Sequence, residues 1–298
     1  MRVGIIAPQG WTGEYDGWDP ARAGARTVAV AHQADALGFD SVWLFDHFQT
    51  EPVPTDEITF EAFVSLSALA VETARVTLGH LVLCAGYRNP ALVAKMIATL
   101  DVVSGGRAEL GLGAGWKEDE YLAYGWSFPP VGERLATLHD ALEITTRMLA
   151  PGRATYDGQT ASVRDAINVP HGIRQPRIPI VVGGNGPKRT WRLAARYADE
   201  LNLDWFTPEE VVAARPVIDS RCAEIGRDPA TLRLSVNIGR PQSAPEGHER
   251  IDLLRRYADA GVDRVMTLIR ASATEDGALE RFAEDCLAAG AELDEAVA

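Results

Sequence analysis

A glycine-rich segment carries the sharpest chemical signal in the chain. Residues 183–190 read Gly-Gly-Asn-Gly-Pro-Lys-Arg-Thr and follow a short apolar run. Backbone N–H groups left free in such a turn, together with the positive end of a following helix, form a binding site for an anion. Pro187 suits the first position of that helix, and Lys188 and Arg189 add positive charge. An ordinary strand-to-helix turn is the alternative. We predict a phosphate site formed by Gly183, Gly184, Asn185, Gly186 and Lys188.

A second signal is the pair Asp46-His47, which follows the apolar run at residues 41–45. A carboxyl group and an imidazole side by side can hydrogen-bond a polar heterocycle or exchange a proton with a reacting centre. Their position just past a strand end favours catalytic roles for His47 and Asp46. The alternative is that the acid caps a loop while the histidine packs nearby.

A third signal is the segment Gly111-Leu112-Gly113-Ala114-Gly115-Trp116. Three glycines at alternate positions would let a flat ligand approach the backbone, and Trp116 would then cover or abut an aromatic ring. The segment is not a dinucleotide-binding fingerprint, because a long loop rather than a helix start follows it.

Other chemistries find little support in the sequence. It contains no HExxH motif, no histidine pair at ligand spacing and no carboxylate cluster, so we expect no metal site. It also lacks the GxSxG elbow of many hydrolases. Cys84, Cys222 and Cys286 are scattered, which argues against a disulfide framework. We do not predict thiol catalysis by Cys84, because a buried structural thiol is the commoner case.

Alternating strands and helices must position these residues. Short β-branched apolar runs, typical of a parallel sheet covered on both faces, alternate with longer amphipathic segments. The predicted strands are residues 3–6, 41–45, 76–83, 107–112, 178–182, 200–203, 232–238 and 264–269. The predicted helices are residues 25–37, 60–72, 91–103, 133–149, 188–197, 208–225, 246–260 and 275–289. This α/β pattern predicts a closed (β/α)8 TIM barrel, with an open doubly wound sheet as the alternative.

Three segments interrupt the repeat. They are residues 9–20 after the first strand, residues 115–130 after the fourth strand and residues 151–177 before the fifth strand. The third contains a hairpin-like turn at residues 156–159. No low-complexity linker divides the chain, so we expect a single domain over residues 1–298. Active sites of such barrels lie at the C-terminal ends of the strands, where all three chemical signals fall.

The composition limits the partners that we expect. The 298 residues carry a formal net charge of −13, from 42 acidic and 29 basic side chains. An acidic surface repels phosphate backbones and anionic lipid, and no apolar run is long enough to span a membrane. We therefore expect no nucleic-acid or membrane partner. The apolar run at the N-terminus is too short for a signal peptide, which favours the cytoplasm.

Taken together, these segments resemble the luciferase-like monooxygenase superfamily, in particular its branch that uses the deazaflavin coenzyme F420. The resemblance covers nearly the whole chain and is strong up to about Trp205. It rests on the three segments above and on Leu37-Gly38-Phe39-Asp40-Ser41-Val42-Trp43, Tyr87-Arg88-Asn89-Pro90, residues 99–107, Glu120-Tyr121, Ala123-Tyr124-Gly125 and Ala195-Arg196-Tyr197-Ala198-Asp199.

The resemblance implies a TIM barrel, usually dimeric, with the cofactor ring beside Asp46-His47 and the cofactor phosphate on residues 183–188. It also implies a cis peptide bond without proline, by position Leu81-Val82, in a bulge that backs the ring. The implied cofactor contacts are Asp46, Leu81, Val82, Cys84, Ala114, Gly115, Trp116, Gly183, Gly184, Asn185, Gly186 and Lys188.

One departure limits what the resemblance implies about the reaction. Relatives that act on sugar phosphates place an acid directly after the glycine-rich turn, where this chain has Trp116. Acids follow at Glu118, Asp119 and Glu120. The sugar-phosphate activity is therefore not carried over to this chain, and the identity of an assisting acid stays open.

The sequence thus predicts a homodimeric, F420-dependent oxidoreductase that moves a hydride between the deazaflavin and a small organic substrate. His47 is the predicted group that hydrogen-bonds or exchanges a proton with the reacting centre. Three alternatives remain: an FMN-dependent monooxygenase on the same scaffold, a barrel hydrolase or isomerase that binds its substrate's phosphate, and a non-catalytic cofactor-binding barrel.

Overall fold

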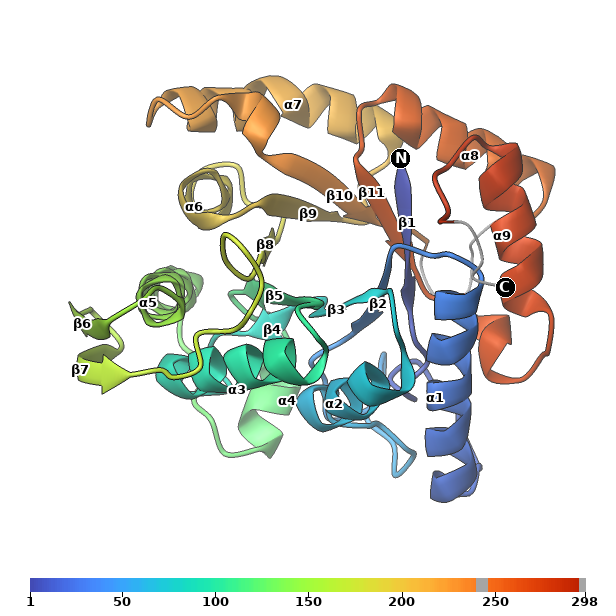
Figure 1. Cartoon of the computed structure of the whole chain (residues 1–298), viewed down its shortest axis with the longest axis horizontal. Helices are drawn as coiled ribbons and strands as arrows, with labels where there is room; N and C mark the ends of the chain where they lie inside the picture. The colour runs from blue at the N-terminus through green and yellow to red at the C-terminus, as the bar shows by residue number, and fades with distance from the viewer. Residues whose placement is uncertain (240–245, 295–298) are drawn as a thin grey trace.

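The protein is a closed barrel of parallel strands, seen in a computed structural model that describes residues 1–239 and 246–294 (Figure 1). The strands pair in the order β3-β2-β1-β11-β10-β9-β8-β5-β4, and an additional β3–β5 pairing closes the ring. Because β3 and β4 both pair with β5, they share one of eight positions around the ring. The strands are β1 (Arg2–Ile6), β2 (Ser41–Leu44), β3 (Thr77–His80), β4 (Leu83–Cys84), β5 (Ala108–Gly113), β8 (Ile180–Gly183), β9 (Glu200–Asp204), β10 (Arg233–Asn237) and β11 (Arg264–Thr267).

Helices surround the barrel and confirm the predicted (β/α)8 architecture (Figure 1). Asn89 accepts hydrogen bonds from the first N–H groups of α3, and Thr207 forms a reciprocal capping box with Glu210 at the start of α7. The α-helices are α1 (Pro20–Ala36), α2 (Ala62–Glu72), α3 (Pro90–Val103), α4 (Glu118–Ala123), α5 (Val131–Leu149), α6 (Thr190–Tyr197), α7 (Pro208–Ala223), α8 (His248–Asp259) and α9 (Ala278–Ala288).

Some predicted boundaries were wrong. The first helix begins at Pro20 instead of residue 25, because Asp19 caps it and proline fits its first turn. The helix expected from residue 188 begins at Thr190, since the preceding residues form a turn, so Pro187 does not occupy the first helical position. The strand expected at residues 76–83 is divided into β3 and β4.

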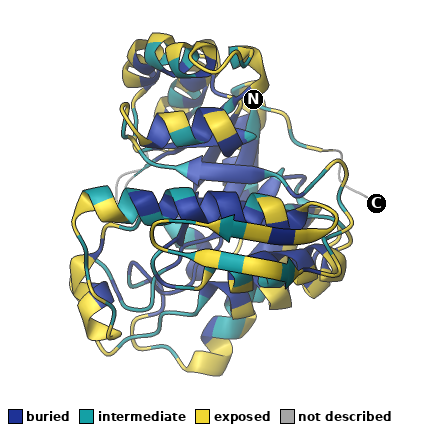
Figure 2. Ribbon diagram, turned by 90° about the vertical axis from the view of Figure 1, so that its left-hand side faces the viewer, coloured by how far each residue is buried: buried dark blue, intermediate teal, exposed yellow. Residues whose placement is uncertain are grey.

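The predicted insertions have different structures. Strands β6 (Arg153–Asp157) and β7 (Ser162–Ile167) form an antiparallel hairpin, as the sequence indicated, with its turn at residues 158–161 instead of 156–159. This hairpin packs beside α5 and carries many exposed residues (Figure 2). The insertion after β5 contains the short helix α4, which the sequence pattern did not predict.

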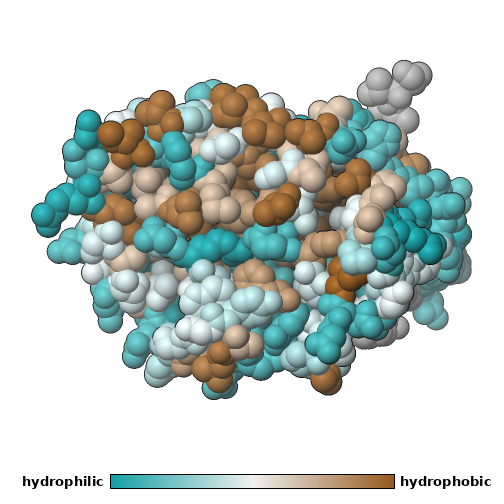
Figure 3. Space-filling model, turned by 90° about the horizontal axis from the view of Figure 1, so that it is seen from below, coloured by the Kyte–Doolittle hydropathy of each residue, from teal (hydrophilic) through white to brown (hydrophobic). Residues whose placement is uncertain are grey.

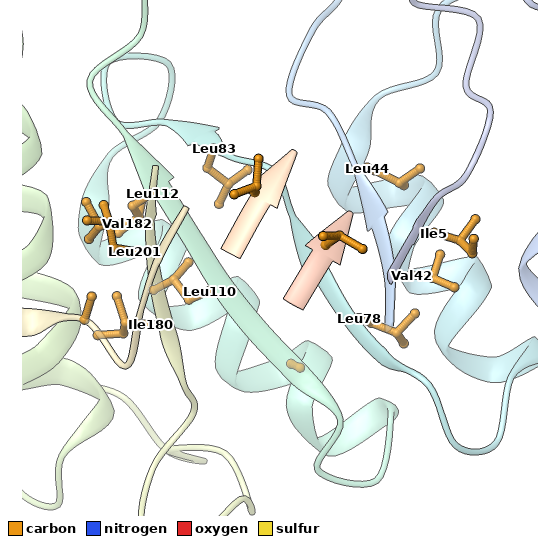
Figure 4. Packing of buried hydrophobic residues seen from close by; sticks show 14 of the residues in the cluster. Ile5, Val42, Leu44, Leu78, Leu83, Leu110, Leu112, Ile180, Val182 and Leu201 are labelled. Carbon is orange, nitrogen blue, oxygen red and sulfur yellow. The ribbon is translucent and has the colours of Figure 1, made fainter. Parts of the chain in front are cut away.

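Buried side chains lie on both sides of the barrel wall. Side chains that point outward from the strands pack beneath the helices, and Figure 4 shows a group of them. Inside the barrel, near the N-terminal ends of the strands, the fully buried Arg264 forms salt bridges with Asp40, Glu109 and Glu200 at 2.8, 2.7 and 2.6 Å. This ion cluster fills one end of the barrel and leaves the opposite end for a site.

Candidate functional site

A cavity of about 360 Å³ lies at the C-terminal ends of the strands. Residues from the ends of β2, β4, β5, β8, β9 and β10 line it, as expected for the active face of a TIM barrel. Asn185, Gly186 and Lys188 are not among its lining residues. The predicted residues that do line it are Asp46, His47, Leu81, Val82, Cys84, Ala114, Gly115, Trp116, Gly183 and Gly184.

The imidazole of His47 is paired with a carboxylate that sequence reasoning left unassigned. Its Nδ1 lies 2.9 Å from Oε2 of Glu120, a residue of α4 whose side chain is fully buried. Glu120 also accepts hydrogen bonds from the Tyr87 hydroxyl at 2.7 Å and from the N–H of Phe48 at 2.7 Å. Such a carboxylate fixes the ring orientation and makes Nδ1 the donor, so that Nε2 is free to exchange a proton.

The protonation state of Glu120 follows from these contacts. Burial raises the pKa of this carboxyl, but hydrogen bonds from His47, Phe48 and Tyr87 outweigh burial and hold the pKa below its usual value. Glu120 is therefore ionised at neutral pH. The sequence signals were its place in the acidic run at residues 118–120 and its match, with Tyr121, to the family resemblance; α4 itself was not predicted.

Aromatic side chains enclose the His47 ring. Trp11, from the segment after β1, stacks on it with ring centroids 4.4 Å apart and planes at 4°. Trp116 meets it edge-on at 5.7 Å and is 58% exposed, so this indole forms part of the cavity mouth. Sequence reasoning predicted Trp116 as a wall of the pocket but missed Trp11.

Asp46 lines the cavity, but its carboxylate is engaged by protein groups. Arg88 donates to both oxygens at 2.8 Å, and the N–H of Cys84 donates to Oδ2 at 2.9 Å. Burial raises the pKa of this carboxyl, while Arg88 opposes that effect. These contacts tie the end of β2 to β4, which matches the loop-holding alternative more closely than proton exchange.

The wall between β3 and β4 contains the unusual backbone that the resemblance implied. The Leu81-Val82 peptide is cis, and both residues line the cavity. The Cγ2 atom of Val82 lies 2.6 Å from the position that a Cβ on Gly113 would take and 2.9 Å from the one on Gly183. Strands β5 and β8 therefore need glycine at these positions to make room for Val82.

The alternate glycines also have a structural reason that the sequence pattern did not reveal. A Cβ on Gly111 would lie 1.9 Å from the backbone oxygen of His80, and one on Gly115 would lie 2.4 Å from Sγ of Cys84. At Gly111, Gly113 and Gly115 glycine is thus required by neighbouring protein atoms, whatever ligand approaches. Cys84 itself contacts the Tyr121 hydroxyl at 2.8 Å, and burial raises the pKa of its thiol to about 11.

The glycine-rich loop after β8 borders the cavity through Gly183 and Gly184. Gly184 has a φ of +133°, a conformation that favours glycine. The Asn185 side chain bonds the backbone of Asp204, donating to its oxygen and accepting from its N–H, each at 2.9 Å. Lys188 lies instead in a separate hollow of about 300 Å³.

Polar residues that the sequence did not single out form the wall opposite His47. Asn202 and Asp204 line the cavity from β9, and Asn237 lines it from β10. Nδ2 of Asn237 donates to Oδ1 of Asp204 at 3.0 Å. These three residues lie at strand ends. The apolar pattern that predicts the strands does not single out polar residues within them.

In residues 1–239 and 246–294, no group of three His, Cys, Asp or Glu side chains is placed to hold a metal ion. None of the helices in these ranges is long and apolar enough to cross a membrane.

Comparisons with known proteins place this chain in a family. The family model described as luciferase-like monooxygenase matches residues 1–294. An uncharacterised protein of Mycobacterium tuberculosis is 30% identical over 87% of this chain and 93% of its own length. An F420-dependent glucose-6-phosphate dehydrogenase of Kineococcus radiotolerans is 39% identical over 59% of this chain, and the matched part is about half of that relative (51%).

A solved structure supports the fold. An F420-dependent secondary alcohol dehydrogenase in complex with an F420-acetone adduct superposes with a TM-score of 0.80 at 20% identity, over 97% of this chain and 98% of that one. At this identity the likeness concerns the fold alone. Together with the family model, these observations show that the chain belongs to the luciferase-like monooxygenase family, as its sequence motifs indicated.

Proposed function

We propose that the protein is an F420-dependent oxidoreductase that moves a hydride between the deazaflavin and a small organic substrate. The single observation that carries this proposal is the cavity in which the Leu81-Val82 bulge, the His47–Glu120 pair and the glycine-rich loop after β8 come together. Relatives that are themselves F420-dependent enzymes support the choice of cofactor.

The residues present fit a planar ring with a phosphate-bearing side chain. Leu81 and Val82 offer an apolar wall beside the ring, and Gly184 borders the same cavity on a loop whose backbone resists a side chain at that position. Asp46, Ala114, Gly115 and the glycine-rich loop would complete the cofactor site. When bound, the deazaflavin would supply a hydride donor or acceptor.

The protein's own contribution would be orientation and proton handling. Nδ1 of His47 donates to Glu120, which leaves Nε2 to give a proton to the reacting atom of the substrate or to take one from it. Trp11 and Trp116 would limit the access of water to the reacting centre. Asp46 would act by holding β2 against β4, through Arg88 and the Cys84 N–H.

Titration of the purified protein with F420 and with FMN, followed by fluorescence, tests the cofactor. We expect F420 to bind more tightly than FMN. FMN binding without F420 binding would favour the FMN-dependent monooxygenase instead. A parallel F420 titration of Lys188→Ala tests whether Lys188 contacts the cofactor phosphate although it lies outside the cavity. If Lys188 makes this contact, the variant should bind F420 more weakly than wild type.

We also propose a homodimeric, cytoplasmic protein with one domain over residues 1–298. The exposed sides of α2 and α3 carry Val64, Val71, Leu92, Val102 and Val103. Figure 3 views the molecule from the side on which these helices lie in Figure 1, and hydrophobic residues gather over part of this face. A helix that is apolar on most sides is normally covered, and a second copy of the chain would cover it.

Buried, unpaired cysteines are consistent with a reducing compartment, which supports the proposed location in the cytoplasm.

A further inference from the structure

The cavity has a polar wall that neither the proposed cofactor contacts nor the His47–Glu120 pair explains. Asp204 is the last residue of β9, and Asn237 is the last residue of β10. In the ring order, β9 is separated from β2 by three strands in either direction, so this wall faces His47 across the barrel. A substrate that reacts near His47 would therefore extend toward Asp204.

Asp204 has a carboxyl oxygen available for a ligand. Its Oδ1 accepts from Nδ2 of Asn237 at 3.0 Å, and no other side chain among the described residues bonds the carboxyl. Asp204 lines the cavity and is only partly exposed. Burial raises the pKa of this carboxyl, and the hydrogen bond from Asn237 only partly opposes that effect. A hydrogen bond donated by a ligand would offset the free-energy cost of burying this carboxyl.

The backbone around Asp204 is held firmly. The Asn185 amide makes two hydrogen bonds, each of 2.9 Å, with the N–H and the oxygen of Asp204. The next residue, Trp205, has a φ of +57°, a left-handed conformation that is rare for a bulky side chain and is usually found where the surroundings enforce it. Its N–H donates to the backbone oxygen of Asn237 at 3.1 Å. These contacts fix the backbone that carries the Asp204 carboxyl.

The charge of the described lining disfavours an anionic partner for this wall. Among the described lining residues, Lys117 carries a full positive charge. Its Nζ is already paired with Glu51 at 2.5 Å and with Asp119 at 3.2 Å. Among the described lining residues, an anionic group at Asp204 would meet a carboxyl instead of an unpaired cation. A hydroxyl group suits both Asp204, as acceptor, and Asn237, whose amide lies beside it.

We propose that Asp204, supported by Asn237, receives a hydroxyl group of the substrate, so that the substrate is a hydroxyl-bearing molecule without an anionic group at the end away from His47. This inference rests on the proposed function, because it assumes that the substrate reacts beside His47. Hydroxyl groups could also come from the side chain of the cofactor. The two sources share the same chemistry, and the experiment separates them.

The test uses the protein loaded with F420 and a matched set of probes: cyclohexanol, cyclohexane-1,3-diol and cyclohexane-1,4-diol. Dissociation constants are measured by ligand-observed NMR for the wild type, Asp204→Ala and Asn237→Ala. We expect wild type to bind one of the diols at least about fivefold more tightly than cyclohexanol, the effect of one hydrogen bond. Asp204→Ala should abolish that preference, and Asn237→Ala should reduce it.

Wild type that binds the diols no better than cyclohexanol, or that binds none of the probes, would overturn the inference. So would an Asp204→Ala variant that keeps the preference. A variant that loses F420 affinity while its diol preference persists would assign the carboxyl to the cofactor side chain. Asp165→Asn, which alters a carboxylate on the distant β6–β7 hairpin, controls for general effects. Failure of wild type to bind F420 would count against the proposed function alone, because the probe comparison can then be repeated without cofactor.

Discussion

Glu120 Oε2 lies 2.9 Å from Nδ1 of His47, although 73 positions separate the two residues in the sequence. The contact joins a strand end of the barrel to the short helix α4. Glu120 stands four positions after Trp116, among the acids whose role the sequence left open. The contact also gives the proposed proton exchange a fixed ring nitrogen, and this geometry can be tested directly.

Glu120→Gln should lower turnover while leaving F420 affinity nearly unchanged. Glutamine keeps the shape of the side chain, so the hydrogen bond to His47 can persist in part, but the negative charge that stabilises a protonated imidazole is lost. We expect turnover to fall by about tenfold or more, because proton transfer by a positioned side chain contributes about 10²–10⁴-fold. The measurements are kcat, KM and the pH profile of the reaction, together with the F420 dissociation constant.

Glu118→Gln is the matched control, because Glu118 lies on the exposed side of the same helix. It should behave like wild type. Equal turnover in Glu120→Gln and wild type would remove Glu120 from the mechanism, whereas a large loss of F420 affinity would indicate a purely structural role.

Gly184→Val should weaken F420 binding by about tenfold or more. The φ of +133° at Gly184 is strained for valine, and the new Cβ would lie 3.2 Å from Cγ2 of Thr190, so the loop beside the cavity must shift. Gly226→Val is the control: its φ is +71°, but nothing lies within 4 Å of the new Cβ and it does not line the cavity. Similar F420 affinities in the two variants would count against the phosphate loop.

His80→Leu should flatten the dependence of stability on pH. Burial lowers the pKa of His80 to about 3, and neither ring nitrogen has a hydrogen-bond partner among the described residues. The unfolded chain therefore takes up a proton between about pH 6.5 and pH 3 that the folded protein refuses, so wild type loses stability as the pH falls through this window. Urea unfolding at pH 7.5 and pH 5 measures the difference. The exposed His32→Leu should retain the wild-type slope, and an equal slope in His80→Leu would refute the prediction.

Arg264→Met should destabilise the fold by about 3–5 kcal/mol, because it leaves Asp40, Glu109 and Glu200 buried without their cation. Arg233→Met is the comparison: Arg233 also pairs with Glu200, at 3.2 Å, but its side chain is 37% exposed, and its loss should cost about 1 kcal/mol or less. Denaturant unfolding at pH 7 gives both values. Equal costs would show that Arg264 is not the centre of the cluster.

Val64→Glu combined with Val71→Glu should convert the proposed homodimer to a monomer. Both valines are exposed on α2, at 75% and 67%, and two charges on that face would have to be buried in a dimer. Light scattering after size exclusion measures the mass. Val212→Glu, on the exposed side of α7, is the control and should leave the mass unchanged. A wild-type monomer would exclude the homodimer at the outset.

The barrel could be predicted because its signals are local and repeated. Apolar runs, glycine stops and caps such as Asn89 mark each strand and helix without reference to distant residues. The site was harder, since its geometry depends on contacts between distant segments. Gly113 seemed to serve a ligand, but Val82, between β3 and β4, leaves no room for a Cβ there. Glu120 and Asp204 acquire their importance only when folding places them beside His47 and Asn237.

The position of Glu120 on α4 has a consequence for how this scaffold can change. The helix lies in an insertion between β5 and α5, outside the eight repeating strand–helix units, and contributes Glu120 and Tyr121 as its buried residues. His47 thus lies at the end of a barrel strand, whereas Glu120 lies in an insertion that the barrel itself does not require. An altered insertion could retune reactivity while the ion cluster around Arg264 and the packed strands kept the barrel intact, so that new chemistry could arise by replacing one short segment.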